Sequence, residues 1–410
     1  MARSSLAQST DRLEAPWLAD AAVTRVVAAL GANNCRFVGG AVRNTLLGEP
    51  VTDIDIATRL EPDAVIARLE AAEIKAVPTG LKHGTVTAVA EGHAIEVTTL
   101  RHDVETDGRH AKVAFTDDWQ ADAARRDFTF NALYAAPDGT LYDYFGGLDD
   151  LKAGHVRFIG DAEARITEDA LRILRFFRFH AHYGAGGMDA AGLDACAALA
   201  GRLDILSVER VRDELLKLLA ATDPVPTLQA MHRARVLRHV LPEFVDFERL
   251  IILVDVARRL VRIDPIRRLA ALLPQDPDTV AQAAARLKLS NVQARRLDAI
   301  AAPEPDVAPG LGDARLRQAL YRYGAEPVID RALLAATVDD VAALEELIDT
   351  AESWRCPTFP VSGDDLKALG HREGQGLGRA LKRLEELWIG SDFKMSRETL
   401  LAALGDVGQP

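Results

Sequence analysis

The chain has 410 residues, of which 48% are hydrophobic and 27% charged, and its formal net charge is −12. This length allows several domains with separate cores, and no apolar run approaches the ~20 residues that span a membrane. The three cysteines are far apart and lack a C-x-x-C spacing, so neither a disulfide framework nor a zinc site is indicated. A reducing, cytoplasmic location fits best. The negative charge argues against indiscriminate nucleic-acid binding.

The most informative stretch is residues 36–58, RFVGGAVRNTLLGEPVTDIDIAT. A short apolar strand runs into Gly39 and Gly40, a helix follows, and a second strand carries Asp53 and Asp55 on one face. Two carboxylates on one face repel each other unless a cation lies between them, and that cation is usually a divalent metal. A glycine pair that opens a helix offers free backbone N–H groups to phosphate oxygens. The stretch therefore predicts metal-dependent nucleotide chemistry.

Hydrophobic periodicity predicts the elements before residue 200. Helices are expected over 18–30, 41–47, 63–72, 124–133 and 163–180, and strands over 37–38, 51–58, 74–78, 84–90, 93–100 and 141–145. On the strand 93–100, Glu96 faces away from its apolar neighbours and could be a third carboxylate beside the aspartate pair. Residues 101–119 have no clear period and are expected to form a long loop.

The segment 124–133, ARRDFTFNAL, has helical spacing that places Asp127 and Asn131 on one face. A carboxylate and an amide together can hold a ribose 2′-OH, which both donates and accepts hydrogen bonds. Arg125 and Arg126 offer cations for a triphosphate. For this segment alone, a capped and salt-bridged surface helix is the favoured alternative.

In the helix predicted over 163–180, Asp169 and Arg172 are i, i+3 neighbours, and Arg175 and Arg178 continue a curling stripe. Cytosine and adenine each present an amino donor beside a ring-nitrogen acceptor. A fixed carboxylate can accept from the amino group while a guanidinium donates to the ring nitrogen. Uracil and guanine present the reverse pattern and would leave buried groups unpaired. The alternative is an ordinary Asp–Arg pair on a helix surface.

Three sequence blocks, GGAVRN…LLG…DIDIAT, RRDFTFNA and EDALR, occur in this order. Together they resemble the class II nucleotidyltransferases, the family of tRNA CCA-adding enzymes and bacterial poly(A) polymerases. One departure is Asn44, where the family usually has Asp. The resemblance implies that Arg126 contacts phosphates, that Asp127 contacts the sugar, and that Asp169 and Arg172 choose the base.

The implied reaction is nucleotidyl transfer from CTP and ATP to the 3′ end of tRNA. Asp53 and Asp55 would hold Mg²⁺, with Glu96 as a further catalytic carboxylate. The predicted nucleotide-binding residues are Gly39, Gly40, Arg43, Arg126, Asp127, Asn131, Asp169, Arg172, Arg175 and Arg178. The segment 101–119 resembles the flexible loop of CCA-adding enzymes. We expect no membrane association, and no protein partner is predicted.

The fold class expected is α+β, with a small mixed β-sheet in an N-terminal catalytic head, followed by an all-helical neck, body and tail. The predicted division is an N-terminal tail 1–20, the head 21–145, a neck with the nucleotide-recognition helix 146–200, the body 201–302 and a tRNA-binding tail 303–410. Basic runs occur at 231–238 and 258–268, and solvated helix faces are the favoured interpretation of each run.

Other activities remain open at this stage. A poly(A) polymerase would share the head and neck, but such enzymes usually end in a strongly basic tail, whereas this chain ends LLAALGDVGQP. An enzyme that adds only CC or only A is a further alternative. A catalytically silent RNA-binding relative is disfavoured because a protein that only binds RNA needs no paired carboxylates.

Overall fold

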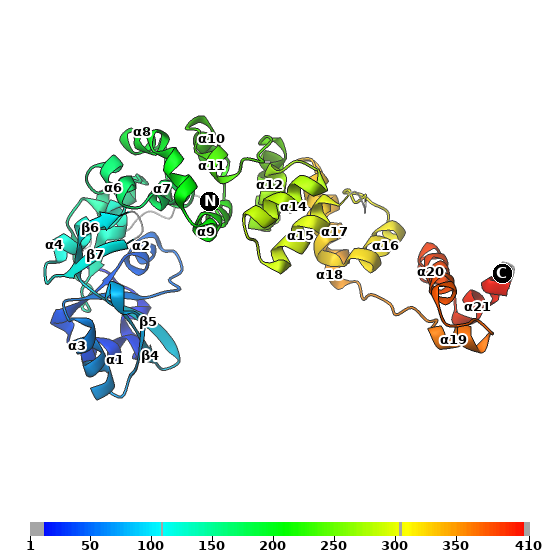
Figure 1. Ribbon diagram of the computed structural model, residues 1–410, viewed down its shortest axis with the longest axis horizontal. Helices are drawn as coiled ribbons and strands as arrows, with labels where there is room; N and C mark the ends of the chain where they lie inside the picture. Colours follow the sequence, from blue (N-terminus) through cyan, green and yellow to red (C-terminus); the bar gives the residue numbers. More distant parts are fainter. Residues whose placement is uncertain (1–11, 108–109, 303–305, 406–410) are drawn as a thin grey trace. The chain divides into compact units, whose positions relative to one another are not determined.

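The computed structural model describes residues 12–107, 110–302 and 306–405, so much of the predicted N-terminal tail lies outside the described residues. The chain divides into two compact units, residues 1–242 and 243–410. The first holds the β-sheets and the second is helical in its described part (Figure 1). The predicted α+β class, a head with a mixed sheet followed by helices, is confirmed. The finer division into five segments stays a prediction.

A seven-stranded mixed sheet with strand order β3-β4-β5-β2-β1-β8-β9 forms the centre of the first unit. Its one parallel pair joins β2 to β5, and the other neighbours are antiparallel. The strands are β1 Cys35–Val38, β2 Asp55–Thr58, β3 Lys75–Gly80, β4 Thr85–Ala90, β5 His93–Thr99, β8 Leu133–Ala135 and β9 Leu141–Asp143. On β5, Ile95 and Val97 are buried while Glu96 between them is exposed, as the alternation predicts.

Helices in the first unit surround this sheet and continue beyond it. Helices α1 and α3 lie side by side against the strands (Figure 1), and α2 packs against β1 and β8. The α-helices are α1 Ala21–Leu30, α2 Gly40–Leu47, α3 Pro62–Ala71, α4 Trp119–Ala124, α5 Gly147–Ala153, α6 Ala162–Glu168, α7 Leu171–Tyr183, α8 Ala190–Ala198, α9 Val208–Leu219, α10 Val225–Arg233 and α11 Leu237–Val240. Short 3-10 turns are η1 Pro16–Ala19, η2 Ala32–Asn34, η3 Leu81–His83, η4 Thr129–Ala132 and η5 Ala200–Ile205.

The strand predicted over 51–58 is shorter in the structure, because β2 begins only at Asp55. Strand β1 ends at Val38, where the chain turns into α2, so the residues ahead of Asp55 have no partner on that side. Asp53 therefore lies in the loop that enters β2, and the prediction that it shares a strand with Asp55 was wrong.

The prediction of a long loop over residues 101–119 was also wrong. Strands β6 (Arg101–Asp107) and β7 (His110–Phe115) pair antiparallel on either side of residues 108 and 109 and form a separate two-stranded sheet. Backbone hydrogen bonds between the two strands form this ribbon, and the sequence has no clear hydrophobic period here, so periodicity did not reveal it. The dipeptide Asp107-Gly108, a common hairpin-turn sequence, was the available signal.

The helix predicted over 124–133 does not form. Helix α4 ends at Ala124, Phe128 makes an isolated bridge with Phe158, and the chain then passes through the 3-10 turn η4 into β8. The aromatic side chain of Phe128 is fully buried among Phe130, Phe158 and other rings. Tertiary packing of these rings thus overrides the local helical spacing.

The single helix predicted over 163–180 is two helices in the structure, α6 and α7, separated at Asp169 and Ala170. Asp169 is extended, with φ −150° and ψ 107°, and its Oδ1 accepts a hydrogen bond from the backbone N–H of Leu171 at 3.1 Å. This bond holds the chain at the break, although the N-cap residue of α7 is Ala170. The predicted apolar row, which includes Ile166, Ile173 and Phe177, is buried as expected.

In the second unit, the helices are α12 Glu248–Arg259, α13 Pro265–Leu272, α14 Pro277–Arg286, α15 Asn291–Ala301, α16 Asp313–Tyr323, α17 Ala325–Ala335, α18 Val341–Ser353, α19 Gly363–Ala368, α20 Gln375–Gly390 and α21 Arg397–Gly405. The basic run 258–268 is only partly a solvated face, because Arg267 and Arg268 are buried. Arg267 and Arg296 both bind the fully buried carboxylate of Asp330. Within the described residues, no helix is long and apolar enough to cross a membrane.

Candidate active site

The acidic edge of the site is built by the parallel pairing of β2 with β5. Asp55 begins β2 and lies in register with Glu96, so both side chains project to the same face of the sheet. Partial burial raises the pKa of Asp55, and the charges of Glu96 and Asp53 raise it further, whereas Arg126 opposes them. Asp53 is exposed and accepts a hydrogen bond from the Thr52 hydroxyl at 3.0 Å. The structure thus brings the three predicted carboxylates near one another.

A tight glycine turn opens α2 beside this edge. Gly39 has φ +70° and ψ −123°, a conformation that residues with a side chain rarely adopt. A Cβ at Gly39 would lie 3.9 Å from Arg126 Nη1, and one at Gly40 would lie 3.9 Å from Arg43 Nη2. The Gly39 N–H donates to the carbonyl of Leu133 at 3.4 Å, so the donors that the turn offers are those at the start of α2. They lie close to two guanidinium groups, which is an arrangement suited to phosphate oxygens.

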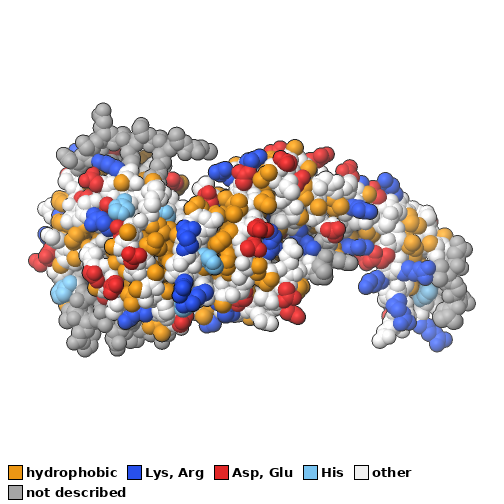
Figure 2. All heavy atoms as spheres, turned by 90° about the horizontal axis from the view of Figure 1, so that it is seen from above, with side chains coloured by type: hydrophobic (Ala, Val, Ile, Leu, Met, Phe, Trp, Pro, Cys, Tyr) orange, Lys and Arg blue, Asp and Glu red, His pale blue; other side chains and the backbone are white. Residues whose placement is uncertain are grey.

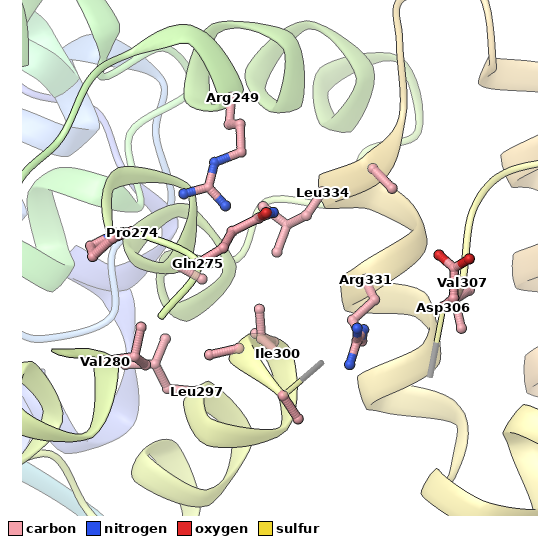
Figure 3. A pocket seen from close by; sticks show the side chains of 14 residues that line it. Arg249, Pro274, Gln275, Val280, Leu297, Ile300, Asp306, Val307, Arg331 and Leu334 are labelled. Carbon is pink, nitrogen blue, oxygen red and sulfur yellow. The ribbon is translucent and has the colours of Figure 1, made fainter. Parts of the chain in front are cut away.

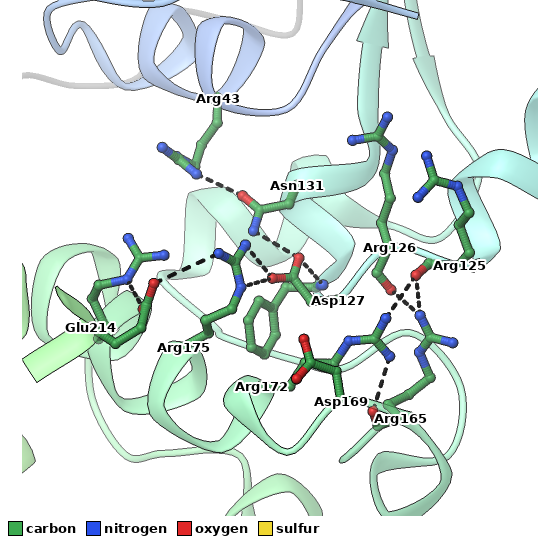
Figure 4. Close-up of polar contacts among 12 residues, drawn as sticks. Arg43, Arg125, Arg126, Asp127, Asn131, Arg165, Asp169, Arg172, Arg175 and Glu214 are labelled. Atoms are coloured by element: carbon green, nitrogen blue, oxygen red, sulfur yellow. Dashed lines mark hydrogen bonds and ion pairs between the residues drawn. The ribbon is translucent and has the colours of Figure 1, made fainter. Parts of the chain in front are cut away.

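A chain of hydrogen bonds joins the helix α2 to α7 across the turn η4 (Figure 4). Arg43 Nη1 donates to Asn131 Oδ1 at 2.6 Å, Asn131 Nδ2 donates to Asp127 Oδ1 at 3.0 Å, and Arg175 Nε donates to Asp127 Oδ2 at 2.6 Å. Burial alone would raise the pKa of Asp127, but Arg175 and the amide of Asn131 outweigh it and the net shift is downward. Asp127 and Asn131 are in contact as predicted, although a 3-10 turn and not an α-helix carries Asn131.

Asp169 and Arg172 do not pair with each other. Asp169 Oδ2 binds Arg210 Nη2 at 2.7 Å, while Arg172 Nη1 binds Glu168 Oε2 at 2.6 Å and its Nη2 donates to the carbonyl of Arg125 at 3.1 Å. The helix break turns Asp169 away, and Glu168, four residues before Arg172, takes its place. Both predicted residues nevertheless line the same cavity.

That cavity measures about 360 Å³ and gathers most of the predicted nucleotide-binding residues. Its lining is Gly39, Gly40, Arg43, Asp55, Arg125, Arg126, Asp127, Asn131, Asp169, Leu171, Arg172, Arg175, Phe179 and Arg210. Asp53, Glu96 and Arg178 are outside this lining. Arg178 instead binds Glu214 of α9 at 2.5 Å and stacks on Phe179 with its guanidinium carbon 4.0 Å from the ring centroid.

Sequence reasoning missed several residues that hold these arginines in place. Asp122 and Tyr134 bind Arg126, Glu214 binds Arg178, and Arg210 binds Asp169. The spacing of Asp122, three and four residues before the two arginines, was a usable signal for the first of these. Glu214 and Arg210 come from α9, which is distant in sequence, so only the fold reveals their contacts.

A second cavity, of about 270 Å³, lies within the second unit (Figure 3). Its walls are mainly apolar, with Leu297 and Ile300 among them, and Arg249 and Arg331 line it as well. It has neither a glycine turn nor a pair of carboxylates among its described lining residues, so it does not resemble a nucleotide site.

Known proteins with similar sequences agree with the nucleotide-binding character of the cavity in the first unit. Residues 35–157 match the family model of the "Poly A polymerase head domain", and residues 188–247 match the "Probable RNA and SrmB- binding site of polymerase A". The mitochondrial CCA tRNA nucleotidyltransferase 1 of Danio rerio is 36% identical over 376 residues, which cover 90% of this chain and 86% of that protein. The human protein of the same name is 35% identical over 379 residues, covering 90% and 85%.

Among solved structures, the Bacillus stearothermophilus CCA-adding enzyme in complex with CTP has a TM-score of 0.76 and 26% identity, covering 94% of this chain and 98% of that one. The shared head domain and the phosphate-binding character of the cavity define the class of protein as an RNA nucleotidyltransferase. Over nine tenths of its length the sequence aligns with CCA tRNA nucleotidyltransferases, and the chain belongs to that family.

Proposed function

We propose that this protein adds CCA to the 3′ end of tRNA, using CTP and ATP and releasing pyrophosphate. One observation carries the proposal: the cavity joins Asp55, the first residue of β2, to the glycine turn and to Arg43, Arg126 and Arg175. In each cycle the tRNA 3′ oxygen bonds to the α-phosphorus, the bond to pyrophosphate breaks, and the hydroxyl proton is lost. Such a reaction requires both negative ligands for metal and positive ligands for the triphosphate.

Nucleotidyltransferases of this family generally use divalent metal ions. Burial raises the pKa of Asp55 most, and the neighbouring charges of Glu96 and Asp53 raise it further, so negative charge gathers at the start of β2. Carboxylate oxygens are the ligands that Mg²⁺ prefers, so the donor set fits this ion, with Asp53 and Asp55 holding it and Glu96 beside them. No group of three potential metal-ligating side chains stands preformed among the described residues. Bound Mg²⁺ would acidify the attacking hydroxyl and stabilise the leaving pyrophosphate.

The chain's own residues bind and orient the nucleotide. Gly39 shapes the turn and Gly40 opens α2, whose first backbone N–H groups face the triphosphate, and Arg43 and Arg126 supply cations for the charge that increases on the leaving oxygen. Asp127 and Asn131, already hydrogen-bonded to each other, offer an acceptor and a donor to the ribose 2′-OH.

Base choice is assigned to Asp169 and Arg172, with Arg175 and Arg178 assisting. Arg172 is anchored on Glu168 and on two backbone carbonyls, so its guanidinium has a fixed orientation. Asp169 is held by Arg210 but its side chain is 31% exposed, which leaves the carboxylate accessible to a base amino group. The Asp169 carboxylate is the acceptor and the Arg172 guanidinium is the donor. This pair matches the amino group and ring nitrogen of cytosine and adenine, and it mismatches uracil and guanine.

The tail, predicted from residue 303 onward, is proposed to bind the tRNA backbone. Lys and Arg side chains gather over α19–α21 (Figure 2), and Arg372, Arg379, Lys382 and Arg383 are exposed there. Cations placed in this way bind phosphates in a sequence-independent and salt-dependent manner. The cytoplasmic location stays a prediction.

Asparagine variants of the aspartate pair test the chemistry. Asp55→Asn keeps the side-chain volume and removes the charge, so incorporation into a tRNA transcript lacking CCA should fall by about two to three orders of magnitude while CTP binding persists through the arginines. Asp53→Asn should behave in the same way. Asp63→Asn, an exposed aspartate on α3, is the matched control. Undiminished incorporation by Asp55→Asn would exclude the carboxylate assignment.

A further inference from the structure

Asp122, on α4, is a buried carboxylate with donors on every side. It is 1% exposed, and its Oδ1 accepts from Arg125 Nε at 2.7 Å and from the backbone N–H of Arg101 at 3.2 Å. Its Oδ2 accepts from the Tyr134 hydroxyl at 2.6 Å and from Arg126 Nη2 at 3.1 Å. The charge-assisted bonds among these are stronger than neutral ones. A carboxylate satisfied in this way is rigid.

This network determines how Arg126 enters the cavity. Its Nη2 is bound by Asp122, and its Nε donates to the Tyr134 hydroxyl at 3.1 Å, so two of the three guanidinium nitrogens are fixed from behind. The third, Nη1, is the atom that lies 3.9 Å from the position of a Cβ on Gly39. No hydrogen bond from Nη1 is formed with the described residues. The free edge of the guanidinium therefore faces the glycine turn.

The backbone behind Arg126 is held as well, but by different residues. Arg165 Nη2 donates to the carbonyls of Arg125 and Arg126, and Arg172 Nη2 donates to the carbonyl of Arg125 (Figure 4). The main chain thus keeps its place without Asp122, whereas the direction of the Arg126 side chain depends on Asp122 and Tyr134. Loss of the carboxylate should misdirect this side chain and leave the local backbone in place.

We propose that Asp122 is a positioning residue for the triphosphate, which aims Arg126 Nη1 at the phosphate site formed by Gly39 and Gly40. The inference rests on the proposed function, in which Arg126 binds the triphosphate. Asp122 is outside the cavity lining. It also binds Arg125 and the backbone N–H of Arg101, but its effect on the triphosphate is assigned to its contact with Arg126. The triphosphate is common to CTP and ATP. Removal of the Asp122 carboxylate therefore weakens the binding of both nucleotides equally and leaves base choice intact.

A double-mutant cycle on the full-length chain tests this role, with CTP and ATP binding measured calorimetrically in Mg²⁺ without tRNA. Asp122→Asn should weaken both nucleotides by about tenfold, by the same factor for each. The double variant Asp122→Asn/Arg126→Ala should bind within about twofold of Arg126→Ala alone, because an effect of Asp122 on the triphosphate that passes through Arg126 disappears once Arg126 is gone.

Two further variants guard against a purely structural effect. Asp330→Asn removes a buried carboxylate that also binds two arginines, but in the second unit, and should lower the melting temperature without changing CTP affinity. Tyr134→Phe keeps the ring and removes the other fixing group, and should weaken both nucleotides by about threefold. If Asp122→Asn does not fold, the cycle is run with Tyr134→Phe and Arg126→Ala instead.

Several outcomes would overturn the inference. The positioning role fails if Asp122→Asn binds CTP as the wild type does while Arg126→Ala is impaired, or if the two effects add fully in the double variant. It also fails if one nucleotide is affected and the other is not. Wild-type binding by Arg126→Ala removes the triphosphate assignment of Arg126 itself, and with it the role of Asp122, whereas incorporation by the wild type would still support the proposed function.

Discussion

The charge state of Asp122 links the site to the stability of the fold. The cations of Arg126 and Arg125 and the Tyr134 hydroxyl outweigh burial and lower the pKa of Asp122 from the usual 3.8 to about 2. Since the folded-state pKa is the lower one, ionised Asp122 stabilises the fold by about 2 kcal/mol above pH ~5, and this contribution is lost as the pH falls from about 4 to about 2.

A pH series of denaturant unfolding checks this contribution. The free-energy difference between the wild type and Asp122→Asn should shrink by about 1 kcal/mol between pH 7 and pH 3. If the free-energy difference stays constant with pH, the arginines and Tyr134 do not lower the pKa of Asp122 in the folded state.

Base choice is a second residue-scale consequence. Asp169→Ala removes the acceptor for the base amino group, so the preference for CTP and ATP over UTP and GTP should fall by at least about tenfold, while the rate with CTP falls less. Competition between labelled CTP and UTP on a transcript lacking CCA measures the ratio. Unchanged rejection of UTP and GTP would remove Asp169 from the reading of the base.

At this scale, sequence reasoning found the residues of the cavity better than their contacts. Asp127 and Asn131 were predicted to meet on a helix and do meet, because a 3-10 turn also brings nearby residues together. Asp169 and Arg172 were predicted to pair and do not. The break between α6 and α7 brings Glu168, the last residue of α6, to Arg172 of α7, while Asp169 binds Arg210 from α9.

Among the elements, the contact between α5 and the turn η4 is especially close. A Cβ on Gly147, the first residue of α5, would lie 2.3 Å from the carbonyl oxygen of Thr129. Gly147→Ala must therefore displace the turn that carries Asn131, with a destabilisation of about 1–3 kcal/mol. Thermal unfolding measures it, and CTP affinity should fall with it. Gly187→Ala is the matched control, because that position has open space around it. Equal melting temperatures would contradict the packing described for α5.

Elements with a strong apolar face were predictable, and those defined by pairing or packing were not. Helices such as α1 and α3 were expected from their periodicity and are present. The β6–β7 ribbon was not expected, because residues 101–119 have no clear hydrophobic period, although their backbone forms an antiparallel ladder. The α6–α7 break was hidden because the buried row continues across it, from Ile166 to Ile173.

For the whole molecule, the order of motifs along the chain was the reliable guide, because it reflects the family and not the local geometry. A catalytic head followed by helices was expected, and the matches to the head domain and to full-length relatives agree with it. The division into units at residue 242 could not be read from the sequence. It depends on which helices pack together, and helix α9, with Glu214 and Arg210, belongs to the unit that holds the site.

The most direct measurement for this account is nucleotide incorporation into three tRNA transcripts that end before CCA, in CC, and in complete CCA. With Mg²⁺, CTP alone should extend the first by two residues, ATP alone should extend the second by one, and both together should complete CCA and stop, leaving the third unchanged. Termination after CC would show that the enzyme adds only CC. Extension of the second transcript alone would show that it adds only A. Long A tracts would identify a poly(A) polymerase, and no incorporation would identify an RNA-binding relative; either result contradicts the proposed function.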